Sequence, residues 1–149
     1  MEFLQNLWAY NNWANQALIK VFLEHGKNLP PACLHLFSHI INTQVVWLSR
    51  LQGTPQLYGA WDDHTVQICK AMHEDSAAGL HLQIQLDAQE LAEIISYKNS
   101  TGSAYQNSRL DILLHVFNHG SYHRAQIATQ MRKNGLVPLN TDYITFKRE

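Results

Sequence analysis

The sequence has few cysteines, and neither of them lies in a metal-binding or redox motif. Cys33 and Cys69 are the only two among 149 residues, and they form no CxxC pair. Each lies within an apolar or helical stretch. We therefore expect two buried thiols in a protein of a reducing compartment.

Long apolar runs and basic segments are also missing. No stretch approaches the roughly 20 apolar residues that a membrane-spanning helix needs. The N-terminus lacks the basic region of a signal peptide, and polar or aromatic residues from Trp8 to Asn12 interrupt any signal-like run. We predict a cytoplasmic protein that does not bind membranes.

Charge is scarce as well, and it is nearly balanced. Charged residues make up 15% of the chain, and the formal net charge is −1 with histidines neutral. This balance argues against a broad basic surface for nucleic acid, and we expect no nucleic-acid partner.

The apolar residues that are present follow helical spacing over four long segments. These segments cover about residues 2–24, 30–52, 65–85 and 108–133. No repeat or linker divides the chain, and its length suits one domain over residues 1–149. The predicted fold class is all-α, a four-helix bundle with a short hairpin or loop before the last long helix.

Shorter elements are expected between and after these helices. Asp87 and Glu90 resemble a capping box that opens a short helix through Ile95. Residues 97–107 are rich in Ser, Thr, Asn and Gly, which favours a tight turn between two short strands. In the tail, residues 138–146, we expect Tyr143, Ile144 and Phe146 to pack back onto the bundle.

Histidine is the residue type that stands out. The last long helix carries His115, His119 and His123 at four-residue intervals, so the three rings share one face. Imidazole is a common metal ligand, but His115 and His123 lie about 12 Å apart along the axis, against metal–nitrogen bonds of about 2.1 Å. One ion can therefore take the first pair or the second, and spacing does not choose between them.

Among the remaining histidines, His39 is the natural third ligand because Leu36 and Ile40 flank it on an apolar helix. His64, His73 and His81 share no spacing, and we predict that all three face solvent. The alternative for each histidine near the core is an ordinary hydrogen-bonded role without a metal.

Four segments together resemble the DinB/YfiT-like family. Residues 97–135 are similar to its hairpin, its His-x3-His-x3-His-Arg-x-Gln helix and its glycine stop. Residues 10–15 are similar to its opening helix, His39 with residues 47–51 to its second helix, and residues 138–146 to its tail. The likeness covers nearly the whole chain.

This resemblance implies a four-helix bundle that holds a divalent metal on His39, His119 and His123, with His115 nearby but not ligating. It also implies a homodimer. The wider superfamily includes thiol-dependent S-transferases and a maleylpyruvate isomerase.

Gly120 departs from the family pattern, in which an acidic or small polar residue often follows the first ligand of the last helix. The motif is therefore not HExxH, and a peptidase with a built-in glutamate base loses its main support.

Three neutral imidazoles leave a fourth coordination position open, which is typical of a catalytic site. We expect an enzyme that acts on a small molecule by thiol transfer or hydrolysis, with a low-molecular-weight thiol as the candidate partner. Zinc or nickel is the first expectation for the ion, followed by iron or manganese. A non-catalytic, metal-stabilised stress-response protein and a bundle without metal are the alternatives.

Several polar side chains are candidates to support the ligands from nearby positions. We expect Arg124 to make a salt bridge or a dimer contact, because it points about 100° away from His123 around the helix. The supporting candidates are Asn12, Asn42, His115 and Gln126.

Overall fold

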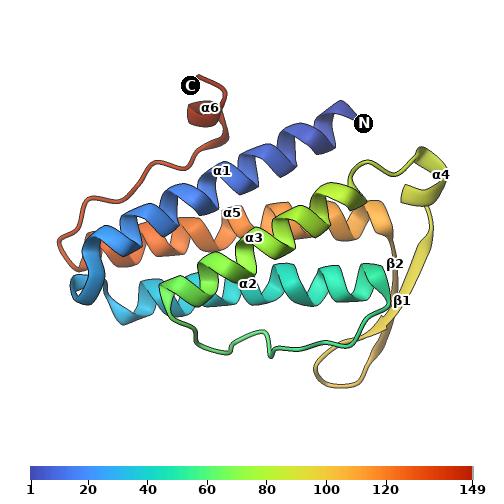
Figure 1. Ribbon diagram of the computed structural model, residues 1–149, viewed down its shortest axis with the longest axis horizontal. Coiled ribbons are helices and arrows are strands. Elements are labelled where there is room, and N and C mark those ends of the chain that lie inside the picture. The colour runs from blue at the N-terminus through green and yellow to red at the C-terminus, as the bar shows by residue number, and fades with distance from the viewer. Residues whose placement is uncertain (149) are drawn as a thin grey trace.

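Four long helices make up most of the computed structural model, which describes residues 1–148. They are α1 (Glu2–His25), α2 (Pro31–Gln52), α3 (Val66–Gln83) and α5 (Arg109–Lys133), and they run alongside one another (Figure 1). The predicted all-α four-helix bundle is confirmed, including the hairpin before the last long helix.

The helices pack in a closed arrangement. Both α1 and α2 pack against α3 and against α5, so α1 and α2 lie at opposite corners of the bundle (Figure 1). A short 3-10 turn, η1 (Gly26–Asn28), follows α1. The pairing of α2 with α5 brings together the two helices that carry His39 and the histidine series.

Local sequence signals set several of the helix ends. Gly53 ends α2 in the left-handed conformation, with a φ of 66°. The Thr65 side chain accepts a hydrogen bond from the Ile68 amide at the start of α3, and Ser108 accepts one from the Asp111 amide at the start of α5. The sequence-based boundaries of α2 and α5 are therefore confirmed.

The segment before α5 differs in part from expectation. Asp87 and Glu90 form the predicted capping box, but the helix that they open, α4 (Ala88–Leu91), ends early. The chain then enters β1 (Ile94–Lys98), which pairs antiparallel with β2 (Ala104–Ser108). The prediction of a helix through Ile95 was wrong, because its β-branched isoleucines suit the strand that β2 pairs with.

The C-terminal tail packs against α1. The short helix α6 (Tyr143–Phe146) places Tyr143 with its ring centroid 5.3 Å from that of Tyr10, and Phe146 with its centroid 5.6 Å from that of Trp13. The predicted return of the tail is confirmed for these two aromatic residues. It was wrong for Ile144, which is 54% exposed.

Two apolar clusters form the core. One surrounds Phe22 and Phe37, whose rings meet edge to face, and the other surrounds Leu80 and Phe117. Between them lies a set of buried polar side chains that we call the buried polar layer. Its members are Asn11, Asn15, Gln44, His73, Ser76 and Arg124.

Gln44 is the centre of this layer. Its Oε1 accepts hydrogen bonds from Asn11 and Asn15 across the bundle, at 2.8 and 2.9 Å. Its Nε2 donates to the Ser76 hydroxyl and lies 3.3 Å from Nδ1 of His73. The side chains of α1, α2 and α3 are thereby joined at one level of the bundle.

His73 is fully buried, so the prediction that it faces solvent was wrong. Its Nε2 donates to Asn12 Oδ1 at 3.0 Å, and its Nδ1 faces Gln44. Helical spacing did contain a signal for this burial, because His73 lies one turn from Cys69 and one turn from Ala77, and both of these residues are buried.

Arg124 also contradicts its prediction. Its side chain is only 2% exposed, and its NH1 donates to the Oδ1 atoms of Asn11 and Asn15, each at 3.0 Å. The ion pairs among the described residues do not include it. Arg124 is therefore buried in the interior, where its described partners are neutral side chains, and does not form a surface salt bridge with a described residue.

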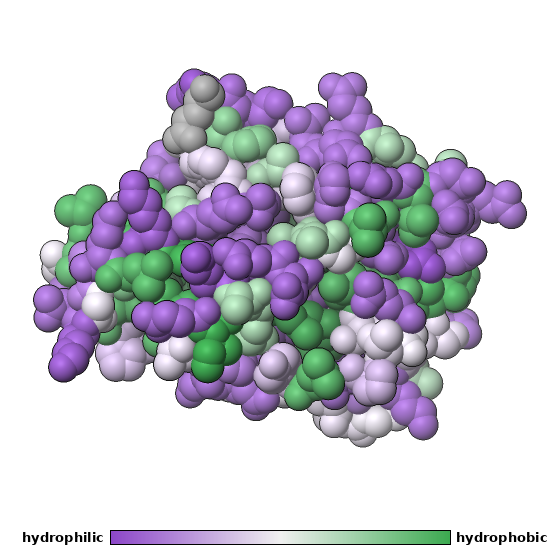
Figure 2. Space-filling view, in the orientation of Figure 1, coloured by the Kyte–Doolittle hydropathy of each residue, from purple (hydrophilic) through white to green (hydrophobic). Residues whose placement is uncertain are grey.

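The outer face of α1 and α3 is mixed in character. Hydrophilic residues cover much of the face seen in Figure 2, with apolar residues between them. The exposed apolar side chains of these two helices include Leu23 and Leu82. Within residues 1–148, no helix has the combination of length and hydropathy needed to cross a bilayer.

Gly120 allows the buried polar layer to approach α5. A Cβ atom at this position would lie 2.7 Å from Asn11 Oδ1 and 2.8 Å from Arg124 NH1. We expect Gly120→Ala to lower the free energy of unfolding by about 1–3 kcal/mol, despite a gain of about 1 kcal/mol in helix propensity. Urea unfolding measures the change.

A double-mutant cycle tests the stated cause. In an Asn11→Ala background the nearest obstacle is gone, so Gly120→Ala should cost at least about 1 kcal/mol less than in the wild type. An equal cost in both backgrounds would show that the clash is not the reason.

His73 predicts a pH dependence of stability. Burial, followed by the charge of Arg124, lowers its pKa from 6.5 to about 4. The unfolded chain therefore binds more protons between these values, and the free energy of unfolding falls as the pH drops from about 6.5 to about 4. The maximal loss is about 3 kcal/mol, with a slope of up to about 1.4 kcal/mol per pH unit.

Urea unfolding at several pH values, on wild type and His73→Gln with metal removed, measures this slope. We expect the variant to show a shallower dependence over the same interval. Parallel curves for the two proteins would refute the assignment to His73.

Candidate metal centre

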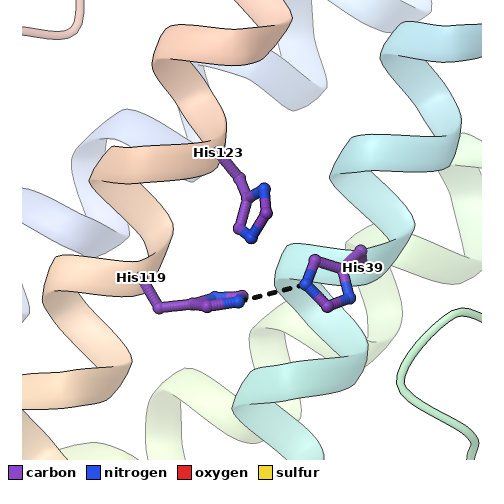
Figure 3. Close-up of side chains that lie close together, drawn as sticks. All are labelled: His39, His119 and His123. Carbon is purple, nitrogen blue, oxygen red and sulfur yellow. Dashed lines mark hydrogen bonds between the residues drawn. The ribbon is translucent and has the colours of Figure 1, made fainter.

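Three histidines from two helices meet at the interface of α2 and α5. His119 and His123, one turn apart on α5, face His39 on α2, and Figure 3 shows the three rings directed toward one another. The Nε2 atoms of His39 and His119 lie 3.1 Å apart. One ring nitrogen from each histidine lies within 4.8 Å of the others.

These distances fit a single metal ion. Bonds of about 2.1 Å in tetrahedral geometry place ligand nitrogens roughly 3.4 Å apart. The 3.1 Å contact and the 4.8 Å upper limit lie on either side of that value. Small rotations of the rings would therefore bring all three nitrogens within bonding distance of one ion.

Hydrogen bonds orient two of the rings. His39 Nδ1 donates to the carbonyl oxygen of Ala60 at 2.7 Å, and His123 Nδ1 lies 2.7 Å from Gln126 Oε1. A proton on Nδ1 leaves Nε2 with a free lone pair. Both rings are thus held in the tautomer that a metal requires.

The electrostatic surroundings favour the neutral form of His119 and of His39. Burial, followed by the neighbouring imidazoles, lowers the pKa of His119 to about 3. Burial also lowers the pKa of His39, although its hydrogen bond to Ala60 acts in the opposite direction. At neutral pH their nitrogens are therefore available as ligands.

The loop between α2 and α3 completes one side of the site. The indole of Trp61 stacks on His39, with centroids 3.6 Å apart and planes 4° from parallel. Asn42 secures this loop, because its Nδ2 donates to the Asp62 carbonyl and its Oδ1 accepts from His64 Nε2, both at 2.7 Å. Sequence reasoning missed Ala60 and Trp61, since nothing in a loop sequence shows which helix it contacts.

The other candidates are placed as follows. Gln126 contacts His123 directly, and Asn42 acts through the loop. His115 lies outside the three-histidine group, with its ring centroid 5.5 Å from that of His119 and 5.2 Å from that of Trp47. Asn12 bonds to His73 in the interior. The structure thus brings His39, His119 and His123 together, and their role as ligands stays a prediction.

Comparisons with known proteins agree with this architecture. Residues 1–149 match the model of the DinB family. The chain is 23% identical over 158 residues to Protein DinB of Bacillus subtilis (strain 168), covering 95% of this chain and 92% of that one. The crystal structure of a DinB-like protein from Bacillus cereus shares the fold, with a TM-score of 0.66 and 18% identity over 94% of this chain and 96% of that one.

The bond from His123 to Gln126 predicts an effect on metal affinity. Loss of a partner that orients a ligand typically weakens binding about 10- to 100-fold. We expect Gln126→Leu to weaken zinc binding by about this factor in a competition titration with a chromogenic chelator. Gln130→Leu, one turn further along α5, is the matched control and should bind as the wild type does. Equal affinities for all three proteins would rule out this role.

Proposed function

The chain belongs to the DinB family, and on this premise we propose that it is a metal-dependent enzyme that acts on a small molecule by thiol transfer or hydrolysis. One observation carries the proposal: the metal-binding group among residues 1–148 consists of three histidines and no fourth ligand. A site with three protein ligands keeps a position for water or substrate, whereas structural zinc sites usually have four protein ligands.

The residues present suit a divalent ion of the zinc type. When bound, the ion supplies a Lewis acid that lowers the pKa of a water toward about 7 or stabilises a thiolate. His39, His119 and His123 hold it. Zinc or nickel is our first assignment, followed by iron or manganese, because imidazole suits several of these metals.

Aromatic side chains flank the group. Trp61 stacks on His39 and is 53% exposed, and Tyr122 lies edge-on to His123 with centroids 5.0 Å apart and is 63% exposed. These rings offer apolar contact to a substrate beside the site. The three-histidine group contains no carboxylate that could act as a general acid or base. His115, which borders His119, is the side chain that we assign to proton exchange with a bound molecule.

The second candidate function is a non-catalytic protein that its metal stabilises. The observation in its favour is that the ligands come from α2 and α5, so an ion would link His39 to His119, 80 residues later in the chain. The low-molecular-weight thiol, the homodimer, the lack of a nucleic-acid partner and the cytoplasmic location all stay predictions under either function.

Metal analysis of purified protein tests the ligands. We expect one bound ion per chain in the wild type and in His115→Ala. His39→Ala, His119→Ala and His123→Ala should each bind at least about 100-fold more weakly, because each loses a ligand rather than a supporting contact. One tightly bound ion in all three of these variants would contradict the assignment.

Turnover assays then separate the two functions. Metal-loaded wild type is offered electrophiles with a low-molecular-weight thiol, and separately activated esters, with His119→Ala as the inactive reference. Turnover by the wild type alone supports the enzyme. Absence of turnover, combined with a large loss of thermal stability on metal removal, favours the structural role.

A further inference from the structure

A hollow of about 580 Å³ lies between α5 and the C-terminal tail, away from the three histidines. One wall is α5, from Ser121 to Arg132, and the other is the tail from Pro138 to Tyr143, with Tyr10 closing one side. Its volume falls within the range of small-molecule sites. Because α5 turns about 100° per residue, this side of the helix is remote from the face that carries His123.

Arg124 lines this hollow as a buried cation without a countercharge. Its hydrogen-bond partners Asn11, Asn15 and Ser121 are neutral, and the ring of Tyr10 lies 5.2 Å from its Cζ. Its Nε has no partner within the described chain. A buried charge whose partners are all neutral is costly, and an anion beside it would offset that cost.

Arg132 brings a second guanidinium to the same hollow, two turns further along α5. It is exposed, and the ion pairs between described residues do not include it. Among the lining residues that the structure describes, Asp142 alone carries a carboxylate. The hollow therefore carries more positive than negative charge, with its more buried cation at Arg124.

We propose that this hollow binds a small molecule carrying a carboxylate or phosphate group. The exposed guanidinium of Arg132 presents a fork of N–H donors that matches either oxyanion. Arg124 acts through its charge, because its NH1 and NH2 already donate to Asn11, Asn15 and Ser121. The volume exceeds that of a bare anion, and Ala128, Pro138 and Leu139 provide apolar surface for the rest of the molecule. The site is separate from the metal centre and does not depend on the proposed enzymatic function.

Calorimetric titration of the full chain tests the proposal with benzoate, benzamide and inorganic phosphate, at constant ionic strength in chloride. We expect saturable binding of benzoate and phosphate, with benzamide, the neutral analogue of benzoate, binding at least about tenfold more weakly. Arg132→Gln should weaken benzoate binding by about tenfold or more. Lys133→Gln removes the same charge from the neighbouring exposed residue and should leave binding within about twofold.

Arg132 is chosen because an Arg124 variant risks unfolding the interior. The titration is repeated with His119→Ala and after metal removal, and we expect unchanged affinity in both cases. Three results would overturn the proposal: no saturable binding of either anion up to about 20 mM, equal weakening by Arg132→Gln and Lys133→Gln, or loss of binding with the metal. The last result would assign the anion to the histidines instead.

Discussion

The packing of α2 against α5 is the contact on which the functional geometry depends. It places a ring from residue 39 against rings from residues 119 and 123, with two Nε2 atoms 3.1 Å apart. The loop that follows α2 adds the Ala60 carbonyl and the Trp61 indole, so the α2 side of the site is built by one continuous segment. Any change in the pairing of these two helices would separate the ligands.

The buried polar layer holds that packing in register. Gln44 lies five residues after His39, and Arg124 follows His123 directly, so each helix carries a site residue beside a residue of the layer. A shift of α2 by one turn would separate Gln44 from Asn11 and Asn15, and a shift of α5 would separate Arg124 from the same two residues. Either shift would leave a buried polar group without partners, at a cost of several kcal/mol. The polar interior and the histidine group are therefore linked through the same two helices.

The buried polar layer also explains why a glycine, Gly120, follows His119 in the histidine motif. Its position on α5 faces α1, where a Cβ would meet the Asn11–Arg124 hydrogen bond. A glutamate at this position would collide with the polar layer, because its Cβ alone would lie under 3 Å from Asn11 and Arg124 atoms. The lack of an HExxH sequence thus has a steric reason, and it agrees with a site that contains no carboxylate among its ligand group.

Much of the local structure could be predicted from the sequence, because helical periodicity, the Ser108 and Asp87 caps and the turn near Gly102 are short-range signals. The shared helix face of His115, His119 and His123 also follows from spacing alone, and the family resemblance pointed to His39, His119 and His123 as the ligands. Only the tertiary structure oriented His39 through Ala60 and buried His73 and Arg124. The physical reason is that the partners of these side chains are distant in the chain, at separations from 21 residues for His39 and Ala60 to 113 for Arg124 and Asn11. Periodicity shows which face of a helix is buried, but the pairing of polar groups across the interior is decided only when the helices pack.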